Sequence, residues 1–131
     1  MATKRRTTKR PRKARTRRTP GKKRGEPNGL ELYHRQTHIE DRLKSGELSG
    51  VIGYECWTFE LFLDAEGKHV NYTPDWVVQR SDSEIELHET KGGRWMGDSR
   101  IRFKAAAARY PMFHWTAYVY SGKKIKKVEA L

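Results

Sequence analysis

Three side chains near the middle of the chain have the types and spacing needed for metal-assisted hydrolysis. Asp75 and Glu89 are separated by 13 residues, and Lys91 follows Glu89 by two positions. Carboxylate oxygens suit a hard cation such as Mg²⁺ or Mn²⁺, which keeps waters that a substrate phosphate can displace. Such a cation polarises a phosphoryl oxygen and lowers the pKa of a bound water. A neighbouring ammonium stabilises charge that develops on the phosphate, and the Thr90 carbonyl is placed to add a backbone ligand.

Two short apolar-rich segments, residues 70–79 and 84–91, are expected to bring these side chains together as a β-hairpin around a polar turn. Side chains alternate between two faces along a strand. The faces of the second segment are Ile85, Leu87, Glu89 and Lys91 on one side, and Glu84, Glu86, His88 and Thr90 on the other. Glu89 and Lys91 therefore continue a core-facing row, where charges are costly unless they are paired or bound to a metal.

Together with this hairpin, the elements are expected in the order helix, three strands, helix, strand, with the first three strands as an antiparallel meander. Asn28 is suited to cap a helix over residues 30–44 that ends at Gly46 and the Ser49-Gly50 pair, a strand covers residues 54–63, and a second helix covers residues 100–109. The last strand, residues 113–121, follows a helical crossover and is expected to run parallel to its neighbour. This order predicts an α/β domain over residues 28–121, with a mixed sheet flanked by helices.

Basic residues are concentrated at the N-terminus. The chain has 28 Lys and Arg against 16 Asp and Glu, a net charge of +12, yet residues 1–24 hold 13 of the basic residues and no acid. Residues 1–27 have too few apolar side chains to fold and are predicted to be a disordered tail, which binds nucleic-acid phosphates or serves only as a solubilising or localisation segment. Residues 122–131 form a second basic end. The predicted nucleic-acid contacts are Arg5, Arg6, Lys9, Arg10, Arg12, Lys13, Arg15, Arg17, Arg18, Lys22, Lys23 and Arg24 in the tail, and Arg94, Arg100 and Lys104 after the hairpin.

The single cysteine, Cys56, excludes an internal disulfide and suits a reducing compartment. No apolar run approaches the roughly 20 residues needed to cross a membrane, and no secretory signal is evident. A cytoplasmic protein without membrane partners is therefore expected.

At Pro74-Asp75 and Glu89-Thr90-Lys91 the chain resembles the restriction-endonuclease-like, or PD-(D/E)xK, nucleases. The predicted element order also resembles the common core of that superfamily, and the surrounding residues are similar to a small phage-type family, which implies a bacterial host cell as the location. The resemblance implies metal-dependent phosphodiester hydrolysis, with Asp75 and Glu89 as metal ligands and Lys91 as the catalytic lysine. A first-helix glutamate approaches the metal in many members. Glu31 is the best match, and Glu40 is the second candidate.

Each of these candidate site residues, taken alone, could instead have a purely structural role. Asp75 could simply follow a proline in a turn, Glu31 could complement the helix dipole, and Glu89 with Lys91 could form a surface ion pair worth about 0–1 kcal/mol. His88 is expected to pack or face solvent, and His34 with His38 lack an evident third ligand. Trp76 and Trp115 are expected in the core, whereas packing and substrate contact are equally open for Trp95.

The sequence therefore favours a Mg²⁺- or Mn²⁺-dependent endonuclease that cuts DNA with structure selectivity or without sequence preference, because phosphate contacts position a protein without reading bases. A junction-resolvase-like enzyme of this kind would act as a homodimer. The tail does not distinguish DNA from RNA. A non-catalytic nucleic-acid-binding protein on the same fold is the alternative, and a ribosome-associated basic protein is a third hypothesis that leaves the Glu89–Lys91 pair unexplained.

Overall fold

The computed structural model describes residues 25–95 and 97–131. The predicted tail contacts, Arg5 to Arg24, lie outside the described residues. The described part is an α/β fold with a five-stranded mixed sheet in the order β1-β4-β5-β6-β7 and a separate two-stranded sheet, β2-β3. The strands are β1 (Leu48–Tyr54), β2 (Phe59–Leu63), β3 (His69–Tyr72), β4 (Trp76–Arg80), β5 (Ile85–Gly92), β6 (His114–Ser121) and β7 (Lys124–Ala130). The predicted α/β class with a mixed sheet is confirmed, whereas the restriction-endonuclease-like core stays a prediction.

The first helix is built as the sequence predicted. It comprises α1 (Gly29–His34), a π-helical segment η1 (Arg35–Ile39) and α2 (Glu40–Lys44). Asn28 caps it through a capping box: the Glu31 amide donates to Asn28 Oδ1 at 2.9 Å, and the Asn28 amide donates to Glu31 Oε2 at 3.1 Å. Gly46 ends the helix in the left-handed conformation, with φ of 81°.

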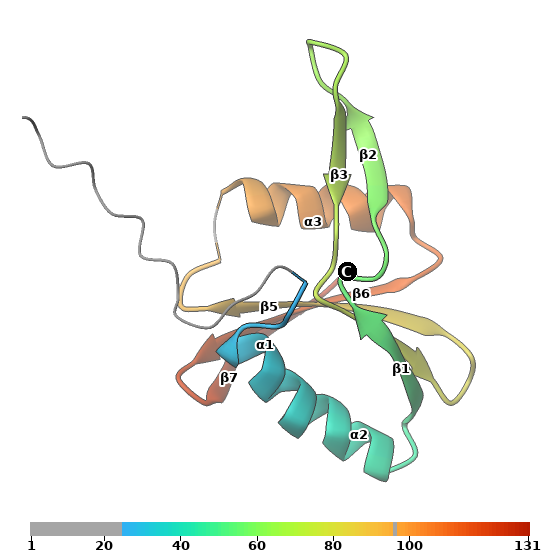
Figure 1. Ribbon diagram of the computed structural model, residues 1–131, viewed down its shortest axis with the longest axis vertical. Coiled ribbons are helices and arrows are strands. Elements are labelled where there is room, and N and C mark those ends of the chain that lie inside the picture. Colours follow the sequence, from blue (N-terminus) through green and yellow to red (C-terminus); the bar gives the residue numbers. More distant parts are fainter. Residues whose placement is uncertain (1–24, 96) are drawn as a thin grey trace, which may run out of the picture.

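The hairpin and the crossover also follow the prediction. β4 and β5 pair antiparallel, with Trp76 opposite His88 and Gln79 opposite Ile85. β5 then continues through α3 (Asp98–Arg109) to β6, which pairs parallel to β5. Figure 1 shows α3 on one side of the main sheet and α1 with α2 on the other, so the central strand β5 is covered on both faces.

The prediction of a single strand over residues 54–63 is wrong. Glu55 has a positive φ of 44°, which a strand does not allow, and its amide donates to the Asp75 carbonyl at 2.9 Å. The chain therefore turns out of β1 before β2 begins. Residues 49–50, expected at the helix end, lie inside β1, and the segment expected as one strand over residues 70–79 divides into β3 and β4 around Pro74. β2 and β3 form an arm that projects from the main sheet (Figure 1).

The C-terminal residues complete the main sheet. The sequence analysis set residues 122–131 apart from the domain at 28–121, yet β7 pairs antiparallel with β6 over most of that segment. In this segment, lysines and apolar residues do not alternate regularly, so the sequence pattern did not predict a strand. Lysine-rich edge strands discourage pairing with other chains, so the basic end is also the protected edge of the sheet.

Two apolar clusters hold the layers together. Phe103 and Ala106 of α3 pack with Leu87 and Trp115 on one face of the sheet. On the other face Ile39 packs with Leu48, Trp76 and Val78. The predicted core positions of Trp76 and Trp115 are thereby confirmed. None of the described helices has the length and apolar character needed to cross a membrane.

Candidate functional site

Asp75 and Glu89 are neighbours across the β4–β5 hairpin. Trp76 pairs with His88, so the preceding residue, Asp75, lies beside Glu89 on the adjoining strand. Both carboxylates are buried, with exposed fractions of 8% and 5%. Lys91 is partly exposed, and its Nζ lies 3.2 Å from Glu89 Oε1. The structure thus brings together the three side chains that the sequence singled out.

Hydrogen bonds fix the orientation of both carboxylates. The Thr90 amide and hydroxyl donate to Asp75 Oδ2 at 2.8 Å and 3.0 Å. The Tyr72 hydroxyl, at the end of β3, donates to Glu89 Oε2. Thr90 therefore contacts Asp75 through its amide and side chain, and the use of its carbonyl as a metal ligand stays a prediction. Tyr72 is a site residue that the sequence analysis missed, although its place three residues before Asp75 was a usable signal.

Glu31 joins the acids because the first helix docks against β1 and β4. The Trp76 indole Nε1 donates to the Glu31 carbonyl at 3.1 Å, and the Tyr54 hydroxyl donates to Glu31 Oε2 at 2.6 Å. The Glu31 side chain is only 6% exposed. Glu40, the second candidate from this helix, instead pairs with Arg35 at 2.8 Å. The structure therefore favours Glu31 over Glu40 as the helix glutamate of the site.

The buried acids repel one another. Burial, followed by the charge of Glu89, raises the pKa of Asp75 from 3.8 to about 8. Burial also raises the pKa of Glu89, although the Tyr72 hydrogen bond and the charge of Lys91 act in the opposite direction. The charge of Glu31 contributes to both increases. Folding thus holds Asp75 and Glu89 in a place where their ionisation is unfavourable.

A shallow cleft opens beside Glu89. Its volume is about 380 Å³, and its lining includes Tyr72 and Glu89 together with Ser99 and Arg102 of α3. Lys104, the α3 lysine predicted to contact nucleic acid, is not part of this lining, and its Nζ lies 4.0 Å from Glu129 Oε1. Arg102 is therefore the α3 cation that lines the same cleft as Glu89. The other two predicted contacts after the hairpin, Arg94 and Arg100, line a separate pocket of about 340 Å³.

The donor set suits a hard cation held by few protein ligands. Within the described residues, no three or more His, Cys, Asp or Glu side chains are arranged to hold a metal ion together. Mg²⁺ commonly uses only one or two carboxylates, with waters and the substrate phosphate completing its coordination. Both hydrogen bonds to Asp75 end on Oδ2, which leaves Oδ1 without a hydrogen-bond partner among the described residues. A bound cation would also relieve the repulsion between Asp75 and Glu89.

The opposite face of β5 carries a second polar cluster that the sequence analysis did not foresee. Arg42 donates two hydrogen bonds to Glu86, at 2.6 Å and 2.7 Å, and His88 Nε2 lies 2.9 Å from Glu86 Oε1. His34 Nε2 lies 3.0 Å from His88 Nδ1, and His34 Nδ1 lies 2.6 Å from the Tyr120 hydroxyl. Burial, then the charge of His88, lowers the pKa of His34 to about 2, so His34 stays neutral. This network joins helix to sheet, and of the two roles expected for His88, packing and solvent exposure, the structure shows packing.

Comparison with known proteins found no matching family model, no similar curated protein and no similar solved structure. The functional argument therefore rests on the residues and their geometry.

Proposed function

We propose that this protein is a metal-dependent nuclease of the restriction-endonuclease-like type, which hydrolyses DNA phosphodiester bonds. The observation that carries the proposal is the pairing of buried Asp75 and Glu89 across the hairpin, with Lys91 Nζ at 3.2 Å from Glu89. This cluster raises the pKa of both carboxylates. Perturbed carboxylates beside an open cleft are typical of functional sites, and packing alone gives no reason to hold these acids together.

Each residue has a distinct role in the proposed reaction. Asp75 and Glu89 supply oxygen ligands, and a divalent cation bound there would polarise the phosphate and lower the pKa of a bound water. Thr90 fixes the orientation of Asp75, and Tyr72 fixes that of Glu89. The Lys91 ammonium lies where it can stabilise negative charge that develops on the phosphate.

Charge placement supports nucleic acid as the substrate. Arg102 lies on the cleft beside Glu89, where a guanidinium can bind a phosphate through paired hydrogen bonds. The basic residues of the segment 1–24 supply attraction to a phosphate backbone without base recognition. We therefore propose structure-selective or sequence-nonspecific cleavage, with a homodimer if two strands are cut symmetrically.

Cleavage of supercoiled plasmid and of a four-way junction tests this proposal. Wild type, Lys91→Ala and Lys68→Ala would each be assayed with Mg²⁺, Mn²⁺ or EDTA. Lys68 is a matched control because it is an exposed lysine in the β2–β3 arm. We expect metal-dependent cutting that falls about 100-fold in Lys91→Ala, a typical effect of losing one transition-state stabiliser, and that Lys68→Ala retains. Equal cutting by all three proteins would overturn the role of Lys91.

A non-catalytic nucleic-acid-binding protein is the second candidate. One observation favours it: Tyr72 and Lys91 occupy both oxygens of Glu89, and no three-ligand metal group is present among the described residues. In this alternative, Asp75 and Glu89 have a structural role only, because their hydrogen bonds to Thr90 and Tyr72 connect β3, β4 and β5. Tight DNA binding by wild type and Lys91→Ala, without cutting under any metal, would support it over the nuclease.

A further inference from the structure

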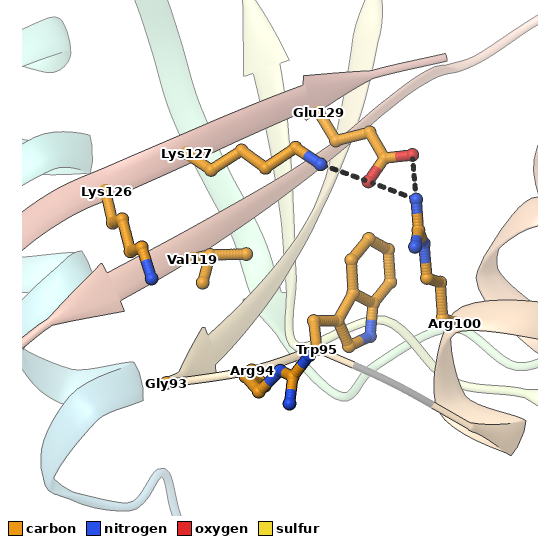
Figure 2. Close-up of a pocket in the computed structure, with 8 residues that line it drawn as sticks. All are labelled: Gly93, Arg94, Trp95, Arg100, Val119, Lys126, Lys127 and Glu129. Atoms are coloured by element: carbon orange, nitrogen blue, oxygen red, sulfur yellow. Dashed lines mark hydrogen bonds and ion pairs between the residues drawn. The ribbon is translucent and has the colours of Figure 1, made fainter.

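A second pocket, called here the basic pocket, lies beside the end of β5 and opens between β6, β7 and the loop that leads to α3. Its volume is about 340 Å³. Val119 and Trp95 form an apolar part of the lining, and Trp95 is buried against Phe103. Figure 2 shows the charged groups around these two side chains, which are Arg94, Arg100, Lys126, Lys127 and Glu129.

Positive charge exceeds negative charge in the basic pocket. Glu129 is the only acid in its lining, and it already lies within 3.3 Å of Arg100 and 3.9 Å of Lys127. Arg94 and Lys126 form no ion pair with any described residue. In Figure 2 the side chains of Lys127 and Arg100 meet Glu129, whereas those of Arg94 and Lys126 do not. Arg100 Nε is also buried without a hydrogen-bond partner among the described residues. The pocket therefore has donors and charge for an anion.

An irregularity in β7 brings two consecutive lysines to this pocket. Val119 pairs with Lys127 and Tyr120 pairs with Ile125, so Lys126 is an extra residue in the ladder. Such a bulge breaks the strict alternation of side chains along a strand. Lys126 and Lys127 can consequently both line the same pocket, which a regular strand would not allow.

The strand register relates the basic pocket to the proposed cleavage site. Val119 pairs with Lys91 on one side and with Lys127 on the other. These three residues therefore form a row across β5, β6 and β7, on the face that α3 covers. Neighbouring strands lie about 4.8 Å apart, so about 10 Å separates the ends of the row.

We propose that the basic pocket binds a backbone phosphate of the nucleic acid, close along the strand to the phosphodiester that is cut. This inference rests on the proposed nuclease function for the position of the cut, while the binding site itself follows from the pocket. The phosphate is held between Arg94 and Lys126, and Trp95 with Val119 supports the adjoining sugar. The pocket thereby sets the direction in which the strand leaves the carboxylates.

Binding measurements without cleavage test the pocket independently of the reaction. The full chain in EDTA would be titrated with a DNA duplex at 50 to 200 mM salt, as wild type and as the double variant Arg94→Ala, Lys126→Ala. The double variant Lys123→Ala, Lys124→Ala is the matched control, because it removes the same charge from exposed residues that line a different pocket. Loss of one phosphate contact should reduce the salt slope by about 0.9, so the affinity ratio to wild type should change about 3.5-fold over this range.

A second arm places single methylphosphonates along the arms of a four-way junction, because the branch point fixes the register of the bound protein, whereas a plain duplex bound without base recognition does not. We expect one position at which the uncharged linkage weakens binding by wild type and by the control, but not by Arg94→Ala, Lys126→Ala. Equal salt slopes for the two double variants, or the same methylphosphonate profile in all proteins, would overturn the pocket assignment. The pocket assignment would also be overturned if inorganic phosphate bound in the pocket but the double variant Arg94→Ala, Lys126→Ala bound DNA as well as wild type does. If the position-specific loss appears but no metal supports cutting, the pocket stands and the nuclease proposal fails.

Discussion

Replacing Asp75 by asparagine is expected to stabilise the folded protein at neutral and alkaline pH. In the unfolded chain Asp75 ionises near its ordinary pKa of 3.8, whereas in the folded chain its pKa is about 8 because of burial and Glu89. Between these pH values the folded state binds one proton more than the unfolded state, so stability falls as pH rises. Asparagine has no charge to oppose Glu89, and its carbonyl can still accept the hydrogen bonds from Thr90.

The size of the effect follows from the same pKa. One extra bound proton lowers stability by about 1.4 kcal/mol for each unit that the pH rises. Between pH 5 and pH 8 the wild type should therefore lose up to about 4 kcal/mol that Asp75→Asn does not lose. Titrating groups that do not interact with Asp75, such as His34, are common to both proteins, so their effects cancel in the difference. Such a gain at a functional residue is an expected trade-off between stability and activity.

Urea unfolding followed by tryptophan fluorescence, in EDTA at pH 5 and at pH 8, measures this difference. Asp41→Asn is the matched control because it makes the same change of side chain at an exposed position on α2. If Asp75→Asn were less stable than wild type at pH 8, or its advantage were the same at pH 5, the argument from buried like charges would be refuted. Saturating Mg²⁺ should then stabilise wild type by about 2.7 kcal/mol at 100 times its dissociation constant and have little effect on the variant.

Three further predictions follow from the structure and the sequence. Glu89→Gln should abolish Mn²⁺ binding in calorimetry while the protein stays folded, and an unchanged titration would show that Glu89 is not a ligand. Removal of residues 1–24 should weaken DNA binding and flatten its salt dependence, so an unaltered slope would exclude the tail from binding. Arg42→Ala should cost about 3 kcal/mol in urea unfolding, because buried Glu86 loses both guanidinium hydrogen bonds and keeps the more distant Arg80, at 3.8 Å, as its nearest arginine. A loss under about 1 kcal/mol would contradict this.

Local patterns predicted those elements whose ends are marked by specific residues. Asn28 and Gly46 delimit the first helix, and the polar turn at residues 81–83 delimits the β4–β5 hairpin. The break between β1 and β2 depends instead on the positive φ of Glu55 and on its amide bond to the Asp75 carbonyl. That contact joins residues 20 positions apart, and the alternating apolar pattern over residues 54–63 gives no sign of it. The strand β7 was missed for a related reason, because an edge strand is not required to carry an apolar face.

The positions of the site side chains could be predicted where they depend only on the alternation of side chains between the two faces of one strand. Placing Glu89 and Lys91 on one face of β5 required only the period of a strand. The position of Glu31 depended on how the helix docks, which the Trp76 indole decides by donating to the Glu31 carbonyl. Tyr72 was missed because β3 was expected to continue into β4, where a tyrosine hydroxyl would not have been singled out. The local sequence pattern thus located the centre of the site, whereas the positions of Glu31 and Tyr72 depended on tertiary contacts.

The two faces of β5 show why one polar cluster is a candidate site and the other is not. On the face toward the first helix, Glu86 is buried, and hydrogen bonds from Arg42 and His88 overcome that burial and lower its pKa. That face is balanced in charge, and its interactions stabilise the fold. On the face toward α3, Glu89 lies beside Asp75 with only the partly exposed Lys91 to offset them, and both carboxyl pKa values are raised. On one face, β5 thus pairs a buried acid with arginine, and on the other it holds Glu89 and Asp75 with the partly exposed Lys91 beside an open cleft. The second arrangement costs stability, which binding a cation and a phosphate would recover.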